Sequence, residues 1–288
     1  MNVKIIADSA CDLSKDYYIE YGIEMVPLNV HLDNKDYADV KEIDPKIIYD
    51  GMRNGKAPKT SQPSPEAFKK VFTASAEKKE PLVYVSFSSK LSGTYQSAKI
   101  MEDQIKAEYP DAPIRVIDSK CASLGYGLVV LHIAKAAKNG ASFDEIVEAA
   151  EHQAQHMEHI FTVDDLEYLY RGGRVSKTSA FVGSLLKIKP ILNVEDGKLI
   201  PLEKLRGSKK VLGRMIELME ERGTDFQNQT IGISHGDDLE RAEQLASLIH
   251  EKFKVPRENI VIEMVGAVIG AHSGPGTLAL FFSNQPNK

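Results

Sequence analysis

Short apolar runs alternate with segments of helical periodicity along the first half of the chain. The runs at 3–9, 82–88 and 114–119 predict buried strands. A fourth extended run, at 23–32, contains Pro27, which favours an edge strand or a bulge. Helical spacing predicts helices at 12–22, 44–55, 60–79 after a polar turn, 92–109 and 123–140. Strands that alternate with helices indicate a mostly parallel sheet with helices on both faces.

Two consecutive helices close this first half. The segment 123–140 is apolar nearly all round, which predicts a buried helix ending at Gly140. The next, 142–159, is amphipathic, and its Ser142 and Glu145 have the spacing of a capping box. We place a domain boundary near its end, because the pattern changes there.

The second half has a different order of elements. Its apolar pattern predicts strands at 159–164, 229–236, 259–266 and 277–283, and a hairpin at 189–207 that turns at Asp196-Gly197. Helical spacing predicts two helices around Gly172-Gly173 within 166–188, and further helices at 208–223 and 237–253. This order indicates an α+β layer with a mixed sheet. We therefore predict an α/β protein with a three-layer N-terminal domain, 1–157, and a smaller C-terminal α+β domain, 158–288.

Composition narrows the class of protein. A chain of 288 residues is long enough for two domains. Its net charge of −5 and its lack of Trp argue against a nucleic-acid surface, and no apolar run has the length of a membrane span. Cys11 and Cys121 form no CxxC pair, and the N-terminus begins directly with a strand pattern instead of a signal peptide. We expect a cytoplasmic protein.

Four polar clusters stand where predicted strands end and helices begin, the edge at which open α/β sheets bind ligands. They are Asp8-Ser9, residues 60–63, residues 86–94 and Asp118-Ser119. Hydroxyls beside free helix N–H groups make an anion site. Taken alone, each cluster is better explained as an ordinary helix cap, but several at neighbouring strand ends favour a site.

Two other motifs concern phosphate and metal chemistry. The sequence contains no GxxxxGK[ST] phosphate loop. His152, His156 and His159 have the i, i+4, i+7 spacing of one helix face, which suggests a metal site. They lack the glutamate of HExxH and lie among Glu and Gln, so a solvated helix face is favoured and no metal is predicted.

A basic cluster follows the first helix of the second half. Arg171, Arg174 and Lys177 lie within seven residues, around two glycines. They could hold a phosphate or a carboxylate-bearing partner, or they could simply complement the dipole at a helix C-terminus. The sequence leaves these two interpretations open.

Seven motifs together resemble one family. They occur in the order ADSACDLS, KTSQPSPEAF, SSKLSGTYQSA, VIDSKCASLGYG, LYRGGRVSK, LLKIKPIL with EDGKL, and GAHSGPGTLALFF. The chain resembles the DegV family, bacterial fatty-acid-binding proteins that carry the acyl chain for a fatty acid kinase. The resemblance extends from Val3 to Phe282 and so covers essentially the whole chain.

The resemblance implies a long-chain fatty acid, such as palmitate, held between the two domains, with no other cofactor. By position in the family motifs, the carboxylate would contact Thr60, Ser92 and His272. Ser61 and Gly93, the neighbours of the first two, are included in the same predicted site.

The resemblance also implies a partner and a non-catalytic role. Arg206, with Arg171 and Arg174, resembles the basic surface that meets the catalytic subunit of the kinase. That subunit supplies ATP and catalysis, and this protein presents the carboxylate for conversion to acyl phosphate. Brief membrane contact is expected when the ligand is exchanged.

The residues agree with a lipid carrier on physical grounds. Burying about 16 carbons contributes about 0.8 kcal/mol per CH₂, so a closed apolar tunnel binds such a chain strongly. The apolar segments 123–134, 180–188 and 266–272 are candidates for its lining. Its carboxylate then needs hydrogen-bond donors, since an unpaired buried charge is prohibitive.

Two alternatives come from other classes. A serine-dependent acyl hydrolase could use Ser92 with His272, and Asp8 is the only candidate to orient the histidine. A purely structural or regulatory interaction protein would have no ligand and no occupied tunnel. Retention of a fatty acid, or turnover of an ester that depends on Ser92, distinguishes the carrier from the hydrolase.

Overall fold

The computed structural model describes residues 3–176 and 188–286. The first half is built on a four-stranded sheet in the order β2-β1-β6-β7, and all three of its strand pairs are parallel. The strands are β1 (Lys4–Asp8), β2 (Glu24–Val26), β6 (Leu82–Ser86) and β7 (Ile114–Asp118). Continuous apolar runs form these strands because both faces of the sheet are covered.

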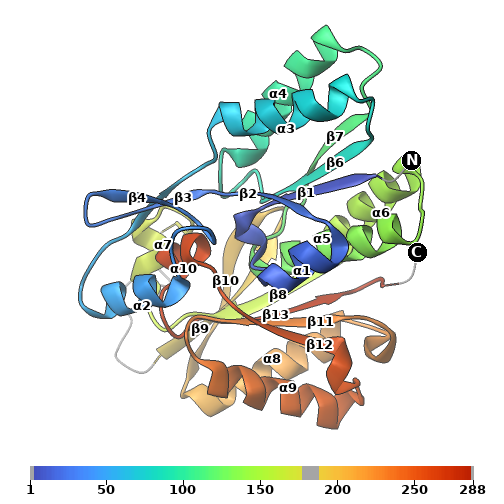
Figure 1. Cartoon of the computed structure of the whole chain (residues 1–288). Helices are drawn as coiled ribbons and strands as arrows, with labels where there is room; N and C mark the ends of the chain where they lie inside the picture. The colour runs from blue at the N-terminus through green and yellow to red at the C-terminus, as the bar shows by residue number, and fades with distance from the viewer. Residues whose placement is uncertain (1–2, 177–187, 287–288) are drawn as a thin grey trace.

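Helices cover this sheet on both faces, as predicted (Figure 1). Successive side chains of a strand point to opposite faces. Ile6 therefore packs under α3 (Pro65–Glu77) and α4 (Thr94–Glu108), whereas Ile5 packs on the side of α5 (Ser123–Lys138) and α6 (Phe143–His156). The prediction of an α/β three-layer unit is confirmed.

A small antiparallel sheet, β4-β3-β5, was not predicted. Its strands are β3 (Asn29–Leu32), β4 (Lys35–Ala38) and β5 (Lys59–Ser61). The extended run predicted at 23–32 is divided into two strands, because the chain leaves the first sheet after β2 and enters this second sheet at β3. Strand β2 is an edge strand of the first sheet, in agreement with the prediction from Pro27. Pro27 lies at the break, where it has no N–H to donate to a ladder. Helices α1 (Lys15–Tyr21) and α2 (Pro45–Arg53) flank these strands in the sequence.

The second half contains a six-stranded sheet in the order β10-β9-β8-β13-β11-β12. Its strands are β8 (Met157–Thr162), β9 (Ile188–Glu195), β10 (Lys198–Arg206), β11 (Ile231–His235), β12 (Ile260–Met264) and β13 (Leu278–Ser283). The pair β11–β12 is parallel and the other pairs are antiparallel, so the predicted mixed sheet is confirmed.

Helices α8 (Ser208–Arg222) and α9 (Leu239–Phe253) cover the outer face of this sheet (Figure 1). The inner face, with Phe161 and Phe281, joins the same apolar cluster as α5. Helix α5 therefore lies between the two sheets, which explains why it is apolar on all sides. The remaining helices are α7 (Glu167–Arg171), α10 (Ala267–Ser273) and the 3₁₀ turns Ser9–Cys11, Phe226–Asn228 and Arg257–Asn259.

Two sequence predictions concern the region between 157 and 207. The hairpin is confirmed, and Asp196 and Gly197 at its turn have φ values of 45° and 78°. Of the two helices predicted in 166–188, α7 is the first, and the second lies outside the described residues. The chain passes from α6 into β8 at Met157, and the boundary between 157 and 158 stays a proposal.

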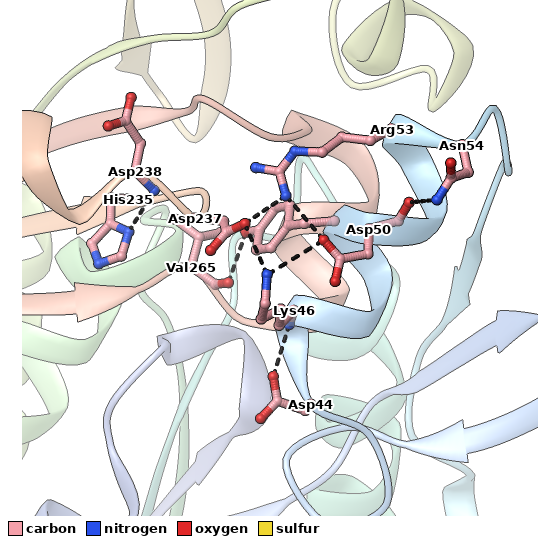
Figure 2. Close-up of polar contacts among 10 residues, drawn as sticks. Asp44, Lys46, Asp50, Arg53, Asn54, His235, Asp237, Asp238 and Val265 are labelled. Atoms are coloured by element: carbon pink, nitrogen blue, oxygen red, sulfur yellow. Dashed lines mark hydrogen bonds and ion pairs between the residues drawn. The ribbon is translucent and has the colours of Figure 1, made fainter.

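Helix α2 ties the two halves together (Figure 2). The Tyr49 hydroxyl donates to the carbonyl of Val265 at 2.8 Å, in a buried hydrogen bond. At the surface, Arg53 Nη1 lies 2.5 Å from Asp237 Oδ2, and Lys46 Nζ lies 3.6 Å from the same oxygen. The buried hydrogen bond contributes more to holding the two halves together than the ion pairs do, because exposed ion pairs add little to stability.

The tip of the β9–β10 hairpin makes a second link. The Ser88 hydroxyl donates to the carbonyl of Gly197 at 2.8 Å, and Lys120 Nζ lies 2.5 Å from Asp196 Oδ1. These contacts hold the hairpin against the first half. None of the described helices is both long and apolar enough to cross a bilayer.

Candidate functional site

A cavity of about 360 Å³ lies between the two halves. This volume is within the usual range for small-molecule sites. Its apolar wall includes Phe87, Leu91, Phe161, Leu169, Val194, Leu199, Val268, Ile269, Ala279 and Phe281. Its polar wall includes Thr60, Ser61, Gln62, Ser92, Gly93, Ser123, Arg174, Ser234, His272, Ser273 and Thr277. Such a cavity suits an elongated apolar ligand with one polar group.

Thr60 and His272 are in contact in this cavity. The family motifs predicted that these two residues share a site. Thr60 Oγ1 lies 2.7 Å from His272 Nε2, although 212 residues separate them in the chain. Strand β5 carries the threonine and helix α10 carries the histidine. Burial, and then the positive charges of Arg174 and Arg171, lower the pKa of His272 to about 4. The imidazole is therefore neutral at pH 7.

Ser92 and Gly93 line the same cavity at the start of α4. The Ser92 hydroxyl lies 2.8 Å from Thr94 Oγ1 and accepts from the Thr94 amide at 3.3 Å. The amide end of the Gln62 side chain lies close to the Cα of Gly93, so a Cβ at Gly93 would require Gln62 to move. Because the first turn of a helix has unpaired N–H groups, this corner favours an anion.

Ser61 has a different environment from its neighbour Thr60. Its hydroxyl lies 3.0 Å from His31 Nε2, and the other ring nitrogen of His31 contacts Asp36. Ser61 borders the cavity, but successive strand residues point to opposite faces, and its exposed side chain is directed toward His31. The structure brings Thr60 and His272 together but does not add the Ser61 hydroxyl to them.

Arg174 differs from the other two arginines in burial and contacts. Arg174 lines the cavity, where its Nε donates to the carbonyl of Leu91 at 3.1 Å and its Nη1 donates to that of Gly172 at 2.5 Å. Burial lowers its pKa. Arg171 and Arg206 are exposed. Arg174 thus lies in the cavity wall and is half-buried, and Lys177 lies outside the described residues.

The Ser92–His272–Asp8 arrangement expected of the hydrolase alternative does not form among the described residues. In the described parts of the chain, Ser92 has no hydrogen bond to His272, whose ring partner is Thr60. Asp8 is buried and accepts from the Tyr84 hydroxyl at 2.7 Å and from the Phe87 amide at 2.9 Å, away from the histidine. Burial raises its pKa to about 6.

His159 was placed wrongly by sequence reasoning. It lies in β8 and lines the cavity, whereas His152 and His156 remain on α6. Its Nδ1 is 3.1 Å from the carbonyl of Met157, and its Nε2 accepts from the Ala122 amide at 3.2 Å. Burial lowers its pKa to about 4. The signal available was the strand pattern that begins at this residue, which outweighs the helical spacing.

The predicted lining segments contribute unequally. Segment 266–272 supplies Val268, Ile269 and His272, whereas 123–134 supplies Ser123. Residues 180–187 of the third segment lie outside the described residues. Ser234, on β11, was not predicted, and its hydroxyl lies 3.0 Å from that of Ser123. Among residues 3–176 and 188–286, no group of three His, Cys, Asp or Glu side chains is placed to hold a metal.

A family model described as "Uncharacterised protein, DegV family COG1307" matches residues 2–285. The chain belongs to the DegV family. Among its relatives, DegV domain-containing protein CPE0026 of Clostridium perfringens is 42% identical over 281 residues, which are 96% of each chain. The resemblance inferred from seven short motifs is confirmed.

Solved DegV structures share the whole fold. A DegV family protein from Thermus thermophilus, described as fatty acid binding, is 32% identical with a TM-score of 0.88, over 98% of this chain and 100% of its own. A stearic acid-binding protein from Eubacterium ventriosum is 29% identical with a TM-score of 0.85, over 97% and 98% of the two chains. Both of these proteins are thus described as binding a fatty acid.

Proposed function

We propose that this DegV protein binds one long-chain fatty acid in the cavity between its halves. The observation that carries the proposal is the Thr60–His272 pair in a cavity whose other wall is largely apolar. Two solved relatives described as binding fatty acids support it. The acyl chain would lie against residues such as Phe161 and Phe281. Each buried CH₂ contributes about 0.8 kcal/mol, so chain length governs affinity.

The carboxylate would lie beside Thr60, Ser92 and His272. These groups, with the first turn of α4, supply hydroxyl and N–H donors in place of a tight pair of arginines. A neutral imidazole donates one hydrogen bond without adding a full charge. The carboxylate is then satisfied, yet it keeps its nucleophilicity toward a phosphoryl group, because the ground state is not over-stabilised.

We further propose that a separate kinase subunit phosphorylates the bound carboxylate. In that reaction a carboxylate oxygen attacks the γ-phosphorus of ATP, and ADP leaves with the bonding electron pair. This protein supplies only the bound acyl group. Arg171 and Arg206, both exposed, are the residues we assign to the kinase contact, and Arg174 is assigned to the cavity. The same proposal places the protein in the cytoplasm, with brief membrane contact during ligand exchange.

Native mass spectrometry of delipidated protein tests the carrier. Palmitic acid is expected to form a one-to-one complex, and hexadecanol, which lacks the carboxylate, is expected to compete poorly. If palmitic acid adds no mass to the protein, the carrier proposal is wrong. If it binds but the kinase subunit and ATP give no acyl phosphate, only the kinase part fails.

A further inference from the structure

The segment that begins at Asp164 lies along the glycine-rich stretch that follows His272. At two points where they come close, the glycine-rich side offers no side chain. A Cβ on Gly274 would lie 2.7 Å from Tyr168 Cε2, and one on Gly276 would lie 3.0 Å from Asp164 Oδ1. Both glycines also have positive φ. The α7 segment therefore rests on backbone at these two points.

At a third point of contact the roles are reversed, and the glycine is on the α7 side. A Cβ on Gly172 would lie closer than 3.0 Å to His272 Nδ1, a separation that real Cβ atoms essentially never show. It would also lie 3.2 Å from Cε1 and 3.3 Å from Cγ of the same ring. The imidazole therefore packs against the bare Cα of Gly172.

Backbone conformation does not require glycine at this position. Gly172 has φ −73° and ψ −13°, which every L residue adopts easily. Its neighbour Gly173 is the opposite case, with φ +71° and open space where a Cβ would be. The two glycines of the RGGR motif thus serve different purposes. The second permits a left-handed turn, and the first leaves room for a ring.

The opposite edge of the imidazole is also fixed. His272 Nε2 lies 2.7 Å from Thr60 Oγ1, and helix α10 holds the histidine backbone. The ring is therefore confined between Thr60 on one side and Gly172 on the other. The carbonyl of Gly172 in addition accepts from Arg174 Nη1 at 2.5 Å, so the glycine itself is held in place.

We infer that Gly172 is a positioning residue, which holds the His272 imidazole at Thr60 by leaving the space that the ring occupies. The inference rests on the proposed function for its effect on ligand binding, but the placement of the ring does not depend on the ligand. A methyl group at Gly172 collides with the ring at Nδ1 and pushes it away, and the Thr60 contact stretches or breaks.

Gly172→Ala is the direct test, with Gly213→Ala as the matched control. Gly213 lies in α8, and a methyl group added there would have nothing within 4 Å. Loss of one hydrogen bond to a charged head group predicts about tenfold weaker palmitic acid binding for Gly172→Ala. The control is expected to bind normally.

Two readouts separate positioning from a general structural defect. In the ligand-free protein, ¹H–¹⁵N spectra of the histidine rings should show His272 shifted by Gly172→Ala, whereas His159, with both nitrogens satisfied, should not move. In a His272→Ala background, Gly172→Ala should weaken binding no further. The inference would be overturned if the His272 signals do not shift. It would also be overturned if Gly172→Ala weakens palmitic acid binding as much in the His272→Ala background as in the wild-type protein.

The wild-type protein provides a test that needs no variant. A nuclear Overhauser contact between the Gly172 Hα protons and His272 Hε1 is expected, because the ring packs on that Cα. Its absence would contradict the inference even if the alanine variant fails to fold. If wild-type protein does not bind palmitic acid, the proposed function is wrong, but the inference about Gly172 is still tested by these spectra.

Discussion

Replacing Thr60 with valine is expected to weaken palmitic acid binding by one to two orders of magnitude. Valine has the shape of threonine and suits a strand, so β5 and the cavity should keep their form. The lost hydroxyl lies 2.7 Å from His272 Nε2 and is assigned to the carboxylate. A hydrogen bond to a charged group contributes about 1.5–3 kcal/mol, which corresponds to roughly 10- to 150-fold in the dissociation constant.

Displacement of a fluorescent fatty acid from delipidated protein measures this effect. Thr73→Val is the matched control, because Thr73 Oγ1 on α3 is buried without a hydrogen-bond partner among the described residues. The control should bind like wild type and be equally stable or more so. Wild-type affinity in Thr60→Val would refute the assignment of this hydroxyl to the ligand head group.

Two further predictions concern stability. Tyr49→Phe removes the buried hydrogen bond to Val265 and leaves that carbonyl without its partner, so urea unfolding should show a loss of about 1–3 kcal/mol; an unchanged midpoint would mean that the bond does not tie the halves together. Burial raises the pKa of Asp39 from 3.8 to about 6. Between pH 3.8 and about 6, the folded state therefore holds a proton on Asp39 that the unfolded state has lost. The contribution of this proton to stability is complete below pH 3.8 and disappears as the pH rises through 6. Relative to wild type, Asp39→Asn should gain about 2 kcal/mol in unfolding free energy between pH 4 and pH 7, and a constant difference would contradict this.

Periodicity predicted the elements whose side chains are buried. The strands of the first sheet and the helix over 123–140 have apolar patterns that only a two-sided burial explains, and the Asp196-Gly197 turn has strong local chemistry. Strands β4 and β5 escaped prediction because they are short, and the residues of β5 are Lys59, Thr60 and Ser61. Only pairing with β3 makes these residues a strand, and pairing partners are not visible in local sequence.

The site could be predicted only through the family motifs. No local rule connects Thr60 with a histidine 212 residues away. The same motifs do not indicate in which direction a side chain points. Ser61 was included as the neighbour of Thr60, and Arg174 was assigned with Arg171 and Arg206 to a basic surface. Strand alternation turns Ser61 outward, and the turn at Gly172-Gly173 brings Arg174 into the cavity wall. Both outcomes depend on tertiary packing.

A crystal structure of the palmitic acid complex tests the central claim most directly. The account predicts the acyl chain in the cavity between the halves, against Phe161 and Phe281. It also predicts a carboxylate oxygen at hydrogen-bond distance, about 2.6–3.2 Å, from Thr60 Oγ1 and from the His272 ring. A chain bound outside this cavity, or a carboxylate at the end away from His272, would contradict the account.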